Sequence, residues 1–324
     1  MSALREVVIT GVGVRTALGQ DPGSVGAAVR AGASALAPLA VLASLPDPRA
    51  AVVPGPDLKP WLKRRKDAKL LPRAAELALA AAGDALQGWA GAREALGLFL
   101  GVGREPPDSG ESEACLIAAC RDGRLDDALL AGPGRDLYPP LLPLKTLPNM
   151  ALAHVSINLG LMGENAAWAG EEGAGWMALH AAWWAVAEGR CAAALAGGAD
   201  SLVDLGSARD RLRLGRGGAP GEAAALLLLE GADHAAARGA SVLGATWALS
   251  GAEAAEATSD QAPLRAALGC TGAAEGPLAL ALALFGAPLA GPDWPKSGDD
   301  RVSLAGADPG LPAVGVRLSR GAES

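Results

Sequence analysis

The sequence predicts an α/β protein in which buried strands alternate with helices. Short apolar runs punctuated by glycine occupy residues 6–14 and 96–103, and runs of this length are typical of buried strands. An alanine- and leucine-rich segment at residues 72–89 lies between them and predicts a helix. The strand–helix–strand order recurs downstream, which favours the α/β class.

The other expected elements extend this order along the chain. After the first strand, residues 24–31 predict a helix. Residues 174–189 predict a long apolar helix capped by Gly189. Further strands are expected at residues 191–195, 225–230, 303–308 and 314–318.

Composition indicates a globular protein and excludes several classes. The 324 residues are 50% hydrophobic and 19% charged, enough for a large core or two fused halves. Net charge is −7, and the basic residues are scattered except at residues 63–66, a run expected to be solvated. No nucleic-acid partner is indicated.

The sequence carries no membrane or metal signal. No apolar stretch reaches the ~18 residues of a membrane span, and the N-terminus runs into a strand without a signal-peptide core. A cytoplasmic location is therefore expected. Cys115, Cys120, Cys191 and Cys270 lack metal-ligand spacing and are expected to be reduced and mostly buried. No metal or cofactor is implied, and the Gly11-x-Gly13 pair lacks the third glycine of a dinucleotide fingerprint.

Several short segments match the motifs of one enzyme family in order and spacing. They are PNMALAHVS at residues 148–156, GLMGEN at 160–165, GEEGAG at 170–175, AGGAD at 196–200 and HAAARGA at 234–240. In this order and spacing they resemble the β-ketoacyl synthases of the thiolase superfamily, as does the opening strand. The resemblance implies a turn at residues 196–200, after the strand at 191–195. The resemblance covers most of residues 5–247 and thins beyond Trp247.

The resemblance implies that the catalytic residues have been lost. Counting without a gap from Gly163, the slot of the cysteine nucleophile falls on Glu172, and a carboxylate cannot form the thioester that elongation requires. Residues 269–276 resemble the family's Gly-His-x-x-Gly-Ala-Ala-Gly loop, and the histidine slot falls on Gly269. The other histidine loop is expected to be deleted, because only residues 250–268 fill its interval. No catalytic residue is therefore expected in this chain.

The remaining reactive side chains offer weaker alternatives. His154, His180 and His234 match neither catalytic histidine and are expected to be structural. Cys270 has no obvious base nearby in sequence. Glu171 and Glu172 could form an acid/base pair, but adjacent residues seldom point the same way, so one carboxylate is expected inside and one at the surface or an interface.

The resemblance implies the layered α-β-α-β-α thiolase fold with a truncated C-terminal half. Its halves are expected at residues 1–205 and 206–324. It also implies a catalytically inactive partner of an active ketosynthase, like the chain-length factors of type II polyketide systems, that reaches acyl carrier protein through the complex. Two alternatives remain open: a Glu172-dependent malonyl decarboxylase or acyl hydrolase, and a non-catalytic carrier-protein-binding scaffold or homodimer.

An interface is expected on two segments. In the family, the regions corresponding to residues 191–195 and 138–155 build a large two-fold or pseudo-two-fold interface. Four tryptophans around the elbow and its helix either join that surface or fill the core: Trp168, Trp176, Trp183 and Trp184.

Overall fold

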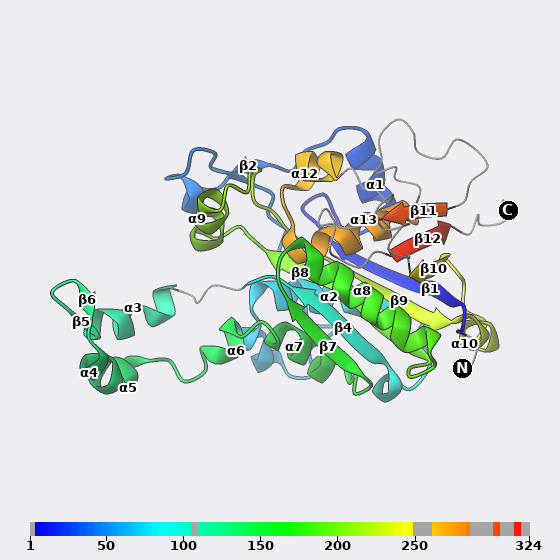
Figure 1. Ribbon diagram of the computed structural model, residues 1–324, viewed down its shortest axis with the longest axis horizontal. Coiled ribbons are helices and arrows are strands. Elements are labelled where there is room, and N and C mark those ends of the chain that lie inside the picture. The colour runs from blue at the N-terminus through cyan, green and yellow to red at the C-terminus, as the bar shows by residue number, and fades with distance from the viewer. Residues whose placement is uncertain (1–3, 105–108, 249–260, 286–300, 305–313, 319–324) are drawn as a thin grey trace.

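The computed structural model describes residues 4–104, 109–248, 261–285, 301–304 and 314–318, and its centre is one mixed sheet (Figure 1). The eight strands have the order β11-β12-β10-β1-β9-β8-β4-β7. Their bounds are β1 Val7–Arg15, β4 Gly97–Val102, β7 Asn165–Ala169, β8 Ala193–Ser201, β9 Glu222–Gly231, β10 Gly244–Ala248, β11 Arg301–Leu304 and β12 Val314–Leu318. Strands β7, β4 and β8 are parallel, and the other pairs are antiparallel.

Helices cover both faces of this sheet. On one face α2 (Arg73–Ala85) packs on β1, β9 and β8, with α7 (Met150–Leu159) beside it. On the other face α8 (Glu172–Ala187) lies on β4 and β8, and α13 (Glu275–Ala283) lies on β9. Helices α1 (Pro22–Arg30) and α12 (Ala262–Leu268) pack outside α13. Each face has its own apolar core.

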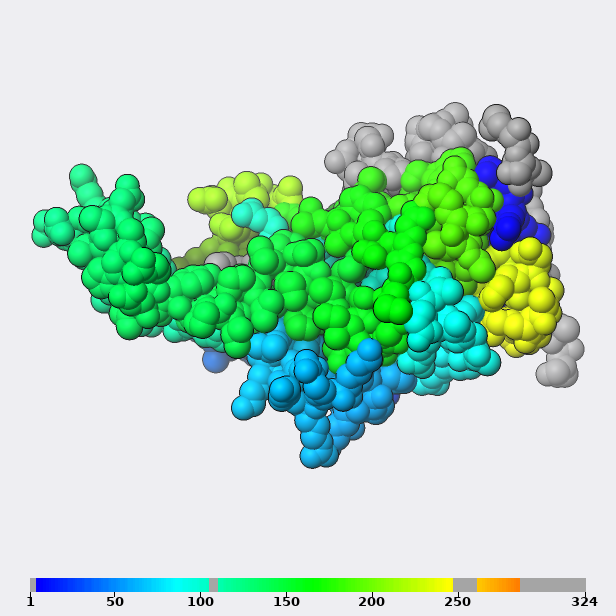
Figure 2. Space-filling model, turned by 90° about the horizontal axis from the view of Figure 1, so that it is seen from below, coloured from blue at the N-terminus to red at the C-terminus, as the bar shows by residue number. Residues whose placement is uncertain are grey.

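Smaller elements complete the described chain. They are β2 Ala37–Pro38, η1 Ala40–Leu42, β3 Arg49–Ala50, η2 Arg65–Leu70, η3 Arg93–Ala95, α9 Leu205–Arg213, α10 Ala232–Ala237 and η5 Gly272–Ala274. A separate arm contains α3 Ser109–Ala118, β5 Cys120–Arg121, β6 Arg124–Leu125, α4 Asp127–Leu129, η4 Leu130–Gly134, α5 Arg135–Leu137 and α6 Pro143–Thr146. Most of this arm projects from the body (Figures 1 and 2).

The expected elements are present, with one correction. The strands and helices predicted around β1, α1, α2, β4, α8, β9 and β12 all form, and Gly189 ends the α8 region with φ 76°. The turn expected at residues 196–200 is wrong. These residues continue β8, because they pair with β4 on one side and β9 on the other. Of residues 303–308, only 303–304 lie within the described part, in β11.

The interior position of β8 also corrects the expected interface. Residues 193–195 pair on both sides and are buried, so the strand expected at residues 191–195 offers no edge to a partner. Within the described residues, the strand with a free edge on this side of the sheet is β7. The division at residue 205 stays a prediction, although β9, from beyond it, lies between β1 and β8.

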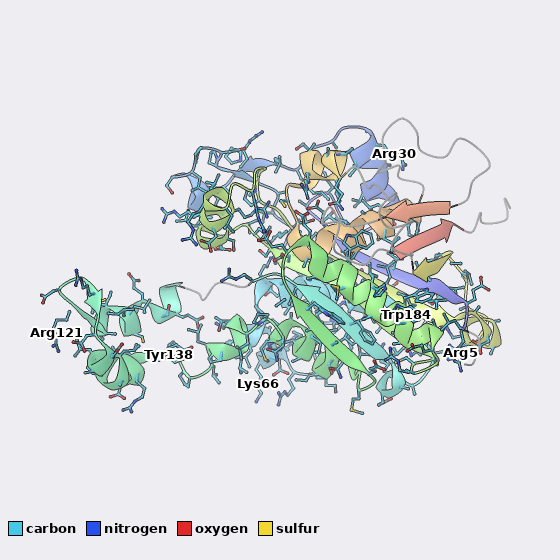
Figure 3. All side chains as sticks on the ribbon, in the orientation of Figure 1. Arg5, Arg30, Lys66, Arg121, Tyr138 and Trp184 are labelled. Carbon is cyan, nitrogen blue, oxygen red and sulfur yellow. The ribbon has the colours of Figure 1, made fainter. Side chains whose placement is uncertain are left out.

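The exposure of the charged run, the cysteines and the tryptophans agrees in most cases with expectation. Residues 63–66 are exposed as expected, and Lys66 is labelled in Figure 3. Three cysteines are buried, and Cys120 is exposed. Among the four tryptophans, Trp176 and Trp183 are core residues, whereas Trp168 and Trp184 are half-buried. No helix in the described ranges is long and apolar enough to cross a membrane.

Candidate functional site

A cavity of about 890 Å³ lies where the three parallel strands end. Arg104 follows β4, Glu171 follows β7, and both line the cavity beside the first turn of α8. In open α/β sheets, the crevice beyond the carboxyl ends of the strands is the usual place for a ligand. The cavity is therefore the candidate functional site.

Glu172, the first residue of α8, belongs to a charged cluster at one wall of this cavity. Its Oε1 lies 2.8 Å from Arg265 Nη2, and Arg265 Nε lies 2.6 Å from Glu275 Oε1. Arg265 thus bridges two carboxylates, one half-buried and one with no exposed surface. A negative charge in the first turn also interacts favourably with the dipole of α8.

Cys270 lies between the same carboxylates. Its Sγ is 3.8 Å from Glu172 Oε1 and 3.7 Å from Glu275 Oε2. Burial, together with the charge of Glu275, raises the pKa of the Cys270 thiol to about 12. The thiol therefore stays protonated at neutral pH and is a poor nucleophile.

The ligand atoms of Glu172, Cys270 and Glu275 all lie within 4.8 Å of one another, close enough to surround a metal ion. The charges around them oppose that use. Arg265 already forms ion pairs with both carboxylates, and a metal would need the thiolate that burial disfavours.

Glu171 and Glu172 both face the cavity, which corrects the expectation that one would point away. Glu171 forms an ion pair with Arg216 and lies 3.6 Å from Arg211 Nη1, whereas Glu172 turns to Arg265. The two carboxylates share one cavity because arginines from different parts of the chain bind each of them.

Gly269, the expected histidine slot, lies at the C-terminal end of α12 in a left-handed conformation with φ 69°. A Cβ atom there would lie 2.7 Å from the backbone oxygens of Ala219 and Pro220. Both the dihedral angle and the available space therefore oppose any side chain at this position.

Asp200, at the end of β8, connects the strand to the segment before α13. Its carboxylate accepts hydrogen bonds from the backbone N–H groups of Ser201, at 2.8 Å, and Ala273, at 3.0 Å. Complete burial nevertheless raises the pKa of Asp200 to about 7.

The three histidines make contacts elsewhere and do not line the cavity. His154 Nε2 lies 3.4 Å from the Leu144 carbonyl oxygen, and Trp184 Nε1 donates to His180 Nε2 at 3.1 Å. His234 Nδ1 lies 2.9 Å from Glu230 Oε2. Burial lowers the pKa of both His154 and His180, which keeps these rings neutral.

Sequence motifs did not identify the arginines around this cavity as site residues. Arg104, the neighbouring pair Arg211 and Arg216, and Arg265 come from three separate regions of the chain and line one cavity. Only Arg104 had a local signal, because it directly follows a predicted strand. The other three come together through tertiary packing.

Comparison with known proteins relates the chain to one protein family. The profile of the family "Beta-ketoacyl synthase, N-terminal domain" matches residues 4–217. No curated protein sequence matches the chain significantly.

Three solved structures share the architecture. The ishigamide ketosynthase/chain length factor superposes with a TM-score of 0.72 at 19% identity, over 98% of this chain and 100% of that chain. The AntDE:AntF complex, a type II PKS acyl-carrier protein with its ketosynthase, gives 0.69 at 14% identity, with coverage of 98% and 99%. A β-ketoacyl synthase from Burkholderia phymatum STM815 gives 0.69 at 19% identity, with coverage of 98% and 100%. These similarities confirm the expected thiolase fold.

Proposed function

Because this chain belongs to the β-ketoacyl synthase family, we propose that it is a non-catalytic subunit that pairs with an active ketosynthase and shapes the cavity for the acyl or polyketide chain. One observation carries the proposal. The residue at the start of α8, where the family resemblance puts the nucleophile, is Glu172, ion-paired with Arg265.

Condensation needs a thiolate and donors for the developing enolate and oxyanion. The nearby thiol, Cys270, is protonated and lies between two carboxylates. No histidine lines the cavity, and the backbone at Gly269 opposes a side chain. This supports a role in which the chain contributes shape instead of covalent chemistry.

Two features support pairing with another subunit. The edge of β7 is free within the described sheet and offers backbone groups to a further strand. The arm and α6 expose a group of large apolar side chains, namely Leu116, Ile117, Leu125, Leu130, Leu137, Tyr138, Leu141 and Leu147. Tyr138 is visible on this arm in Figure 3. Exposed apolar groups of this kind mark interaction surfaces.

The partner that we propose is an active ketosynthase, and acyl carrier protein would meet the chain through that complex. Two of the structurally similar proteins are described as a ketosynthase/chain length factor and as a ketosynthase with its acyl-carrier protein. The expected products are polyketides or specialised fatty acids.

The test is co-expression of the full chain with each active ketosynthase of the same organism, followed by affinity purification through a tag on the ketosynthase. We expect a stoichiometric complex that extends acyl chains, whereas the chain alone does not. Leu141→Asp, between α5 and α6 of the arm, should weaken co-purification. Leu214→Asp, an equally exposed leucine after α9, is the matched control and should not.

Two results would contradict the proposal. Release of CO₂ from a malonyl thioester by the isolated chain, lost in Glu172→Gln, would favour a decarboxylase. A chain that binds carrier protein directly and never co-purifies with the ketosynthase would favour a scaffold.

A further inference from the structure

Arg211 is a buried cation whose hydrogen-bonding capacity is largely unused. It lies in α9, and its side chain is only 9% exposed. Within the described residues, Nε and Nη1 have no hydrogen-bond partner. Nη2 donates a long hydrogen bond of 3.5 Å to the Gly217 carbonyl oxygen. Buried donors without protein partners are costly, so at a cavity they favour a ligand that brings acceptor oxygens.

Arg211 lines two cavities at once. One is the cavity of about 890 Å³ described above, and the second, of about 410 Å³, also contains Arg104, Glu171 and Asp200 in its wall. Arg211 therefore faces cavities whose volumes are typical of binding sites for small organic molecules.

The charges around the larger cavity favour an anion. Four arginines and two glutamates line it, and one positive charge remains in excess even when Glu275, which pairs with Arg265, is counted. Glu171 partly neutralises Arg216 but lies beyond hydrogen-bond range of Arg211. The first turn of α8 also borders the cavity, and helix N-termini attract anions.

We propose that Arg211, assisted by Arg104 and Arg216, binds the oxyanion group of a small organic molecule, a carboxylate or a phosphate. A guanidinium presents several donors to such groups and remains charged at any physiological pH. Trp168 and Met177 line the same cavity and give the organic part of the ligand an apolar contact. This binding site requires neither a nucleophile nor a partner subunit.

The test measures ligand binding to the full chain by isothermal titration calorimetry at constant ionic strength. The probes are malonate, inorganic phosphate and coenzyme A, with uncharged malonamide as the comparator. We expect saturable binding of at least one anion and none of malonamide. Binding of malonate alone indicates a carboxylate ligand, whereas binding of phosphate or coenzyme A indicates a phosphate ligand.

Arg211→Gln should weaken binding of that anion by about tenfold or more, equivalent to ~1.4 kcal/mol. Arg213→Gln is the matched control, because Arg213 lies on the same helix with a 79% exposed side chain, and its affinity should stay within about twofold. Without ligand, Arg211→Gln should melt close to the natural protein, because the Arg211 side chain makes only a long hydrogen bond to Gly217, at 3.5 Å, and a long ion pair with Glu171, at 3.6 Å.

If Arg211→Gln fails to fold, Arg104→Gln replaces it, since Arg104 is exposed and lines both cavities. It should weaken binding by several-fold. Absence of saturable anion binding, or unchanged affinity in the folded Arg211 or Arg104 variant, would overturn the proposal. Co-purification with a ketosynthase is unaffected by either result, so the two proposals fail separately.

Discussion

At the scale of single residues, the candidate site is a set of carboxylates held by arginines. Arg265 joins Glu172 to Glu275, and Arg216 holds Glu171. Ion pairs in partly buried places are lost at great cost when one partner is removed, because the other charge stays behind. The site therefore resists conversion to a thiol-based centre by a single change.

Glu172→Cys tests whether a single substitution can create a thiol-based centre. The substitution supplies a thiol but leaves Arg265 without one partner and provides no donor for the enolate, each such donor being worth about 2.7–4 kcal/mol. We expect no detectable β-ketoacyl product from malonyl and acyl thioesters, measured by mass spectrometry of the products. The natural protein, as the control, should form no acyl adduct by intact mass. Product from the variant would show that other residues fill the histidine roles.

Asp200 makes the stability of the fold depend on pH. Its pKa is raised by burial from 3.8 to about 7 in the folded protein, so the folded state holds the proton more tightly than the unfolded state. The associated stability is fully present below pH 4 and is lost as the pH rises through 7. At about 1.4 kcal/mol per pKa unit, the loss over the whole titration is on the order of 4 kcal/mol.

We therefore expect urea midpoints to fall between pH 5 and pH 8, and to fall less in Asp200→Asn. The asparagine cannot ionise, so its residual slope reports the other groups. Equal slopes in the two proteins would mean that Asp200 does not control this titration.

At the scale of elements, glycines decide how closely α8 and α12 approach their neighbours. A Cβ at Gly175 in α8 would lie 2.2 Å from the Ala273 carbonyl oxygen, so this glycine lets the helix contact the segment before α13. Helix α8 is apolar on nearly all sides, which is typical of a helix enclosed by other layers. Its position fixes Glu172 at the cavity.

The end of α12 gives a prediction at this scale. Gly269→Ala should destabilise the protein by more than about 1 kcal/mol, because φ is positive and the added methyl group meets two backbone oxygens. Chemical denaturation measures the change. Gly215→Ala is a suitable control, because Gly215 also has a positive φ of 68° but nothing within 4 Å of its Cβ position. A similar loss in both variants would mean that the close contact at Gly269 contributes nothing beyond the dihedral strain.

At the scale of the whole molecule, the arm that projects from the body (Figure 2) carries many of the exposed large apolar side chains. Obligate interfaces bury about 2,000–5,000 Å² and are largely apolar. The isolated chain is therefore expected to self-associate or to be poorly soluble, and co-expression with an active ketosynthase should yield a soluble heterodimer.

Multi-angle light scattering of the chain alone and of the co-expressed pair measures this difference. As in the co-purification test, Leu141→Asp should shift the measured mass of the pair toward that of the separate subunits, and the control Leu214→Asp should leave it unchanged. A soluble, stable monomer that does not bind the ketosynthase would contradict the expected assembly.

The sequence by itself determined the order of strands and helices and the family frame. Its apolar runs, helical segments and short motifs are local signals, and most of them form elements close to the predicted bounds. It also assigned Glu172 and Gly269 to the positions of lost catalytic residues, which remain predictions. Local patterns suffice for such features because the periodicity of a strand or a helix depends on residues that are close in sequence.

Only the tertiary structure decided which residues share the cavity and which strand has a free edge. Arg211 and Arg265 are distant in sequence from Glu171 and Glu172, so no local pattern could bring them together. The interior place of β8 depends on pairing with β4 and β9, and the continuation of that strand through residues 196–200 follows from the same pairing. Long-range pairing and the burial of charge are properties of the folded chain, and a single sequence does not display them.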